Sequence, residues 1–293
     1  MSTVIENKLA SPAVAVRKKS PFKLKFDRSH VTAYLILLMF TAVYLGPLAM
    51  LVNTAFKTQA SFMRNAVSLP TTLNVANFTE AWQKANFPKY MGNSLLYTTI
   101  ATAIFVVMAV FVAFPIARNY VKGSGFIFTL FLIALFLPPA LVPQFQLMLR
   151  LGLYNTQYGY IMLFIVNPVG IIILVNYIRS IPTELDEAAA MDGCGYFRFI
   201  VSIIFPLIRP AVATITVLHA IGIWNDLITA TIYLTNQNYY PITRGLIVFQ
   251  GVYGNNWPVL AAAVVIMTIP MVILFLFLQR YIISGLTQGA STG

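Results

Sequence analysis

Long runs of apolar residues alternate with short polar segments along most of this chain. Six of these runs are continuous, and we predict a membrane-spanning helix for each, at about residues 31–54, 93–117, 125–149, 156–178, 210–234 and 257–283. A helix needs about 20 apolar residues to cross a hydrocarbon core of roughly 30 Å, so each run is long enough. Transmembrane strands would instead give alternating segments of about ten residues. The pattern therefore predicts an all-α integral membrane protein with six transmembrane helices.

The composition agrees with a membrane protein and excludes other classes. Hydrophobic residues make up 59% of the 293 positions and charged residues only 9%, which is far from the balance of soluble domains. The net charge of +11 does not indicate a nucleic-acid partner, because the basic residues lie before and between the apolar runs. The single cysteine, Cys194, excludes an internal disulfide and a cysteine-based metal cluster. We expect no metal site.

The distribution of lysine and arginine predicts the orientation in the membrane. Thirteen of the 19 lie in residues 1–30 or in segments on the same side of the predicted spans, and this excess marks the cytoplasmic side. Both termini are therefore expected in the cytoplasm, with a basic tail at 1–30 and a short tail at 284–293. The first tail has two interpretations, a disordered segment or one held at the anionic lipid surface.

The one long charged segment between two predicted spans on the predicted cytoplasmic side, about residues 180–209, carries helix signals. Thr183 can cap a helix, with Asp186 three residues on, and alanines 188 to 190 favour its continuation. Gly193 can take a positive φ and end this helix, and a second one is predicted from Tyr196. We expect a helix–turn–helix here. The first helix either docks in a groove of a partner protein or is a solvated acidic connector.

Two of the predicted spans contain polar candidates for a solute pathway or gate. The third has prolines at 138, 139 and 143, followed by Gln144 and Gln146, and is either a kinked helix that lines a cavity or a purely structural kink. The fifth contains Trp224, Asn225 and Asp226. An intramembrane carboxylate costs about 3 kcal/mol, so Asp226 is either satisfied by neighbouring helices or acts in gating or solute contact.

His219, also in the fifth predicted span, is expected to be a hydrogen-bonded interior residue. No second histidine or cysteine stands at a spacing typical of metal ligands. The segment from 55 to 90 is the longest between predicted spans. It either receives a soluble protein on the outer face or packs on its own bundle.

Several short motifs resemble one family of membrane transport proteins. Glu187-Ala188-Ala189, then Asp192-Gly193, then Pro206 thirteen residues beyond the glycine, resembles the EAA loop of binding-protein-dependent ABC importer permeases, especially the sugar branch typified by maltose transport. Further similar motifs are Trp224-Asn225-Asp226, Gly245-Leu246, Gln279-Arg280-Tyr281, Gly285 and Gly289-Ala290. The ending Ser291-Thr292-Gly293 departs from the lysine-containing tail that is common in such permeases.

The resemblance implies a permease subunit for an oligosaccharide or a related sugar in a bacterial cytoplasmic (inner) membrane. Its implied partners are a second homologous permease, two ATPase subunits that bind ATP and Mg, an extracytoplasmic solute-binding protein and the lipid bilayer. The chain itself would carry no cofactor and no catalytic residue. The residues implied to couple it to an ATPase subunit are Glu187, Ala188, Ala189, Asp192, Gly193 and Pro206.

Missing motifs narrow the alternatives. No Gly-x-x-x-x-Gly-Lys-Ser/Thr phosphate loop, Gly-x-Ser-x-Gly elbow or His-Glu-x-x-His helix is present in the sequence. A membrane enzyme therefore lacks a catalytic constellation. A secondary transporter driven by an ion gradient would have to use Asp226, the one strongly acidic residue within a predicted span.

Overall fold

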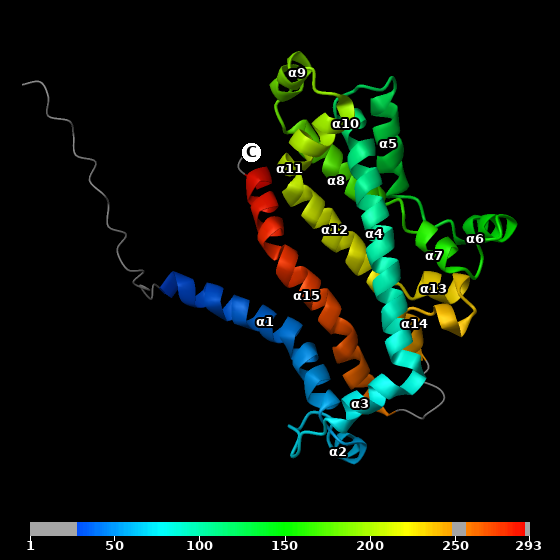
Figure 1. Cartoon of the computed structure of the whole chain (residues 1–293). Coiled ribbons are helices and arrows are strands. Elements are labelled where there is room, and N and C mark those ends of the chain that lie inside the picture. Colours follow the sequence, from blue (N-terminus) through cyan, green and yellow to red (C-terminus); the bar gives the residue numbers. More distant parts are fainter. Residues whose placement is uncertain (1–27, 248–255, 291–293) are drawn as a thin grey trace, which may run out of the picture. The chain divides into compact units, whose positions relative to one another are not determined.

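The computed structural model describes residues 28–247 and 256–290, and the regular structure over those residues is helical (Figure 1). The chain divides into two compact units, residues 1–49 and 50–293. Most of the predicted basic tail and residues 291–293 lie outside the described residues. The first unit contains most of α1 (Arg28–Ala55), whose described side chains from Val31 to Ala49 are largely exposed.

The second unit begins with the end of α1 and holds the remaining elements, which are α2 (Gln59–Arg64), α3 (Ala76–Gln83), a 3₁₀ turn (Lys84–Asn86), α4 (Phe87–Ala117), α5 (Ser124–Ala134), α6 (Leu141–Arg150), α7 (Gln157–Met162), α8 (Pro168–Arg179), α9 (Glu184–Met191), α10 (Tyr196–Phe199), a π-helical turn (Ile200–Ile204), α11 (Phe205–Leu207), α12 (Arg209–Trp224), α13 (Ile228–Tyr233), a second 3₁₀ turn (Gln237–Tyr239), α14 (Ile242–Ile247) and α15 (Trp257–Ala290).

Three of the six predicted spans are long unbroken helices. Val31–Ala55, Phe87–Ala117 and Trp257–Gln279 are each long and apolar enough to cross a membrane. A fourth candidate is the pair Tyr196–Leu207 and Arg209–Trp224, whose axes differ by 82°. The all-helical membrane fold is thus confirmed, whereas the count of six spans stays a prediction.

The other three predicted spans are wrong as continuous helices. In the third, α5 ends at Ala134 and α6 begins only at Leu141, because Pro138 and Pro139 cannot continue the hydrogen-bond ladder. The expected proline kink is a complete break. Its exposed backbone belongs where protein or water, and not lipid, can satisfy it.

The breaks in the fourth and fifth spans end at side chains that cap the next helix. Asn167 Oδ1 accepts a hydrogen bond from the Gly170 amide (3.3 Å) at the start of α8, where Pro168 is the first helical residue. Asp226 accepts from the amides of Thr229 (3.2 Å) and Ala230 (2.9 Å) at the start of α13. Each cap satisfies amides that a break would otherwise leave without partners.

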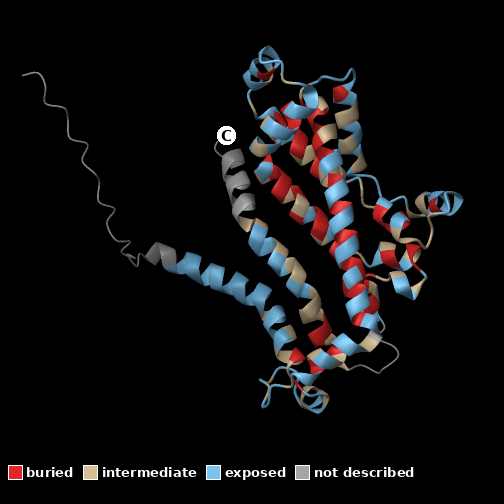
Figure 2. Ribbon diagram, viewed as in Figure 1, coloured by how far each residue is buried: buried red, intermediate tan, exposed pale blue. Residues whose placement is uncertain are grey.

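Buried side chains concentrate along α4, α8 and α12 (Figure 2). Gly170 lets α8 approach α4 closely, since a Cβ there would lie 2.5 Å from Phe105 Cζ. His219 of α12 bonds to Asn167 Nδ2 (3.0 Å) and to the Phe164 carbonyl (2.8 Å), across the break between α7 and α8. The prediction of a hydrogen-bonded interior histidine is confirmed.

The segment between α1 and α4 is packed against other elements of the second unit. Lys57 is 1% exposed and donates from Nζ to the carbonyls of Asn65 (2.9 Å) and Ala66 (2.8 Å). Asn77 Nδ2 donates to the carbonyls of Ala55 (2.8 Å) and Lys57 (2.7 Å). Since α3 also packs against α15 and α4, the interpretation that this segment packs on its own bundle is confirmed.

Candidate coupling site

The predicted helix–turn–helix is present at one end of α4 (Figure 1). Helix α9 ends at Met191, and Gly193 has φ +70°, in the left-handed region that favours glycine. The amides of Gly193 and Cys194 donate back to the carbonyls of Ala190 (3.0 Å) and Ala189 (2.9 Å), which closes the turn. The second helical stretch starts at Tyr196, as predicted.

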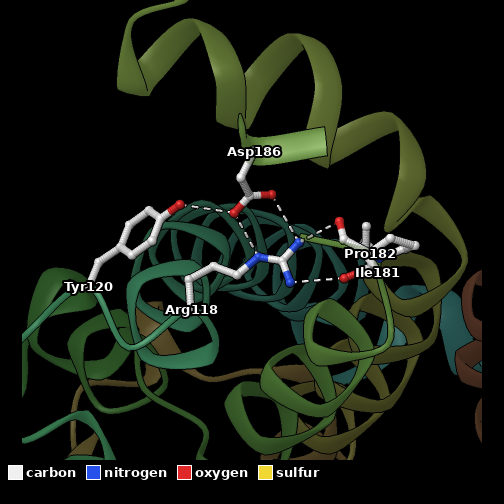
Figure 3. A network of polar contacts seen from close by, with 5 residues as sticks. All are labelled: Arg118, Tyr120, Ile181, Pro182 and Asp186. Atoms are coloured by element: carbon white, nitrogen blue, oxygen red, sulfur yellow. Dashed lines mark hydrogen bonds and ion pairs between the residues drawn. The ribbon is translucent and has the colours of Figure 1, made fainter. Parts of the chain in front are cut away.

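The predicted capping role of Thr183 is wrong, because its side chain makes no cap hydrogen bond. Asp186 has a different partner from the one its spacing indicates. Its carboxylate instead contacts Arg118, the residue that follows α4 (Figure 3).

Arg118 and Asp186 form a buried ion pair. Arg118 Nε lies 2.9 Å from Asp186 Oδ2, and Nη2 donates to Oδ1 at 3.0 Å. The two side chains are 4% and 9% exposed. Arg118 also donates from Nη1 to the Ile181 carbonyl (2.9 Å) and from Nη2 to that of Pro182 (3.4 Å). One guanidinium thus holds both α9 and the segment leading into it.

Tyr120 completes this network from the turn after α4. Its hydroxyl donates to Asp186 Oδ2 at 2.9 Å (Figure 3). Burial raises the pKa of the Tyr120 hydroxyl above its usual value, and the hydrogen bond and charge of Asp186 raise it further. The phenol therefore keeps its proton at neutral pH and remains a donor to the carboxylate.

Helix α9 has two different faces. Ala189 is buried against a core that includes Phe114 of α4 and Phe199 of α10. Glu187 and Met191 are exposed. The exposed residues among those predicted to couple are Glu187, Ala188, Asp192 and Gly193. Helix α9 thus has an exposed surface that is shallow, acidic and partly apolar. Its opposite side is held by Ala189 and by the ion pair of Asp186 with Arg118.

Pro206 lies further along, in α11, and is half-buried. The 82° bend between α11 and α12 follows two residues later, at Ile208. A break therefore precedes most of the fifth predicted span. Pro206 lies close to this bend and outside helix α9.

The residues predicted for a pathway or gate are not gathered at one point. Gln144 Oε1 accepts a hydrogen bond from the Tyr233 hydroxyl at 3.2 Å, whereas Gln146 and Asn225 are exposed. Asp226 is half-buried, and besides capping α13 it accepts from the Tyr160 hydroxyl at 2.8 Å. Trp224 is 1% exposed and lies at the end of α12.

A cavity of about 780 Å³ lies between α4, α12 and α15, and Trp224 is one of the side chains that line it. Its other walls are mostly apolar, and they include the threonine residues Thr98, Thr99, Thr102 and Thr216. The indole NH of Trp224 is buried without a hydrogen-bond partner among the described residues. Within the same residues, no cluster of histidine, cysteine or acidic side chains is arranged to hold a metal ion.

Residues 90–288 match the family "Binding-protein-dependent transport system inner membrane component". The chain belongs to this family. The permease is 32% identical over 284 residues to the probable ABC transporter permease protein YurM of Bacillus subtilis, which covers 96% of this chain and 94% of that protein. It is 33% identical to the arabinooligosaccharides transport system permease protein AraQ of Halalkalibacterium halodurans, with 87% and 92% covered.

Two further similarities concern a named sugar permease and a solved structure. The permease is 32% identical to the melibiose/raffinose/stachyose import permease protein MelC of Bacillus subtilis, over 84% of this chain and 91% of that one. Its fold resembles the crystal structure of a bacterial ABC transporter involved in the import of alginate, with a TM-score of 0.79 and 24% identity, covering 90% of this chain and 100% of that one.

Sequence reasoning missed Arg118 and Tyr120 of this permease. Both lie in the short turn after a long apolar run, where a basic residue is usually an orientation signal and nothing more. The sequence offers one indication of this network in Asp186. It does not fit the capping box, in which the residue three positions after the cap is usually glutamate or glutamine.

Proposed function

We propose that this permease pairs with a second homologous permease and forms with it the path for an oligosaccharide or a related sugar. Transport would be driven by ATP hydrolysis on two separate subunits, which bind the ATP and Mg, and an extracytoplasmic solute-binding protein would deliver the sugar. The observation that supports this most is the exposed outer face of α9 on a helix anchored from behind. The sugar class is supported by the names of relatives such as AraQ and MelC.

In this proposal α9 is the coupling helix and lies in a groove of an ATPase subunit. Glu187 is exposed and would pair with a basic residue there. The alanines beside it would let the groove approach the helix backbone closely. Gly193 would keep the angle between α9 and the next helix, and Pro206 would mark the bend into α12. Both termini and α9 are then cytoplasmic.

The proposed cycle is a largely rigid motion of the helices. ATP binding closes the ATPase pair and carries the docked coupling helices together. The spans then turn from inward-open to outward-open as the binding protein releases its sugar. A short helix can transmit this displacement only if it stays folded and attached to the spans, and α9 is attached through Ala189 and the Asp186 ion pair.

We place this permease's share of the solute path along the cavity between α4, α12 and α15. The break after Trp224 supports this placement, because irregular backbone inside a membrane belongs beside protein or water. Asn225 is the exposed polar residue at that break, and Asp226 fixes its shape. Gln144 and Gln146 would act from helix α6, which contacts α13 through the hydrogen bond between Gln144 and Tyr233.

The test is to purify the tagged chain from its native membranes in mild detergent and to identify its companions by mass spectrometry. The proposal predicts a second permease, an ATPase and, after mild crosslinking, a solute-binding protein. That binding protein should then bind arabino-oligosaccharides or raffinose-type sugars in a titration. Recovery of the chain alone, with sugar uptake intact after reconstitution without any ATPase, would contradict the proposal.

A further inference from the structure

We propose that Arg118 is a positioning residue that clamps the coupling helix α9 to α4, so that a displacement of α9 moves α4 as well. The inference rests on the function proposed above. It concerns how a displacement of α9, whose outer face is exposed, is transmitted to a membrane span.

The first argument is that Arg118 bonds two separate segments at once. Its Nε and Nη2 reach both carboxylate oxygens of Asp186 within α9, at 2.9 and 3.0 Å. Its Nη1 reaches the Ile181 carbonyl at 2.9 Å, in the segment that joins α8 to α9. Because both the helix and its lead-in are tied to one guanidinium, α9 cannot shift relative to the end of α4 without breaking these bonds.

Burial makes this pair a strong link. The Arg118 and Asp186 side chains are 4% and 9% exposed, so water cannot readily replace either partner when the helices move. The planar guanidinium reaches the Asp186 carboxylate and the Ile181 carbonyl from different nitrogens at once, which a lysine ammonium cannot reproduce. Tyr120 adds a third donor at 2.9 Å. Charge alone is therefore insufficient for the clamp, and the geometry of arginine is required.

The second argument is what α4 contacts at its opposite end. Asn93 Nδ2 donates to the carbonyls of Asn238 (2.9 Å) and Tyr240 (3.0 Å), and the Tyr97 hydroxyl donates to that of Tyr239 (2.9 Å). Ser94 Oγ accepts from the Ile242 amide at 2.8 Å. The first turns of α4 are thus bonded to residues 238–242, while the residue after its last turn is bonded to α9.

Helix α4 can carry a displacement between these two ends. It runs for 31 residues without a break, which corresponds to about 46 Å at 1.5 Å per residue. Figure 1 shows α9 near one end of α4 and α3 near the other. Helix α4 therefore connects the coupling helix to the residues at its opposite end, and Arg118 is the attachment between α4 and α9.

The experiment compares Arg118→Lys with wild type in the complete transporter, reconstituted with its partner permease, ATPase and binding protein. Sugar uptake and binding-protein-stimulated ATP hydrolysis are measured in the same vesicles. We expect ATP hydrolysis within about twofold of wild type and sugar moved per ATP reduced about tenfold, as suits the loss of a coupling contact. Tyr120→Phe, which removes one bond, should reduce the ratio about threefold.

Arg179→Lys is the matched control, since Arg179 is exposed and lies over the Phe128 ring at 4.4 Å, outside the clamp. The amount of sugar that this control moves per ATP should equal that of wild type. A merely structural role for Arg118 would lower hydrolysis and uptake in proportion, and a wild-type or proportional result for Arg118→Lys would overturn the clamp. If that variant does not assemble, a wild-type ratio in Tyr120→Phe overturns it. Failure of wild type itself to show ATP-driven uptake would contradict the proposed function instead.

Discussion

At the scale of single residues, Asp186 and Glu187 are neighbouring carboxylates with opposite surroundings. Asp186 is 9% exposed and accepts hydrogen bonds from Arg118 and Tyr120. Glu187 is exposed on the outer face of α9. A helix places successive side chains about 100° apart, so one carboxylate can anchor the helix while the next is presented to a partner.

Replacing Glu187 with alanine should weaken attachment of the ATPase without affecting the fold. Truncating one partner of a buried interfacial charge pair costs about 2–5 kcal/mol, so copurification of the ATPase and sugar uptake should each fall at least about tenfold. Glu80→Ala is the control, since Glu80 pairs with Lys84 at the other end of α4. Normal membrane levels of Glu187→Ala with wild-type uptake would count against the coupling assignment.

Asp226 shows why a single acidic residue in a span is not enough to infer a proton pathway. Its carboxylate accepts from the Tyr160 hydroxyl (2.8 Å) and from the amides of Thr229 and Ala230. These contacts confirm the interpretation that neighbouring groups stabilise Asp226. A role beside the solute path remains part of our proposal.

Asp226→Asn should lower the stability of the purified permease, because an amide nitrogen cannot accept the bonds that a carboxylate oxygen accepts. We expect a loss of about 1–3 kcal/mol, measured as a lower midpoint in thermal unfolding in detergent. Tyr160→Phe should cost less, and the double variant should cost less than the sum, since both changes remove the same bond. Unchanged stability together with abolished uptake would instead indicate an ion-coupling carboxylate.

At the scale of elements, the sequence predicts the long helices and the turn at Gly193 correctly, predicts only a kink where the third span is broken, and overlooks the breaks in the fourth and fifth spans. Apolar runs identify α1, α4 and α15, which continue as helices although each contains an internal proline. The breaks at Asn167-Pro168 and at Asp226 are marked by capping residues. A single polar residue changes the mean hydropathy of a segment of about 20 residues very little, so the hydropathy pattern does not show these breaks. The pair of Arg118 and Asp186 was beyond prediction, since 68 residues separate its partners.

Close packing of α8 against α4 gives an element-scale prediction. Gly170→Ala would place a Cβ 2.5 Å from Phe105 Cζ, so one of the helices must shift, at a cost of about 1–3 kcal/mol. The matched control is Gly222→Ala in α12, which has open space around it and should be neutral or slightly stabilising.

The measurement for this pair is the thermal unfolding midpoint of each variant in detergent. Adding Phe105→Leu to Gly170→Ala should restore part of the loss, because the smaller side chain makes room for the new methyl group. Equal midpoints for Gly170→Ala and Gly222→Ala would show that the two helices are less tightly packed than the structure indicates.

At the scale of the whole molecule, the second unit places its functional parts at the two ends of α4. One end carries the turn with Arg118, the proposed coupling helix α9 and the bend into α12. The other carries α3 and the bonds to residues 238–242. The excess of basic residues in the tail and in the segments expected on the α9 side predicts that this end lies in the cytoplasm, where the proposed ATPase would meet it.

The most direct test of the central claim is sugar uptake into vesicles that contain the permease with or without its partner subunits, energised either by ATP or by an ion gradient. We predict uptake only when the second permease, the ATPase, the binding protein and ATP on the ATPase side are all present, with no response to the gradient. Uptake by the permease alone, driven by the gradient and abolished by Asp226→Asn, would contradict the account and identify a secondary transporter.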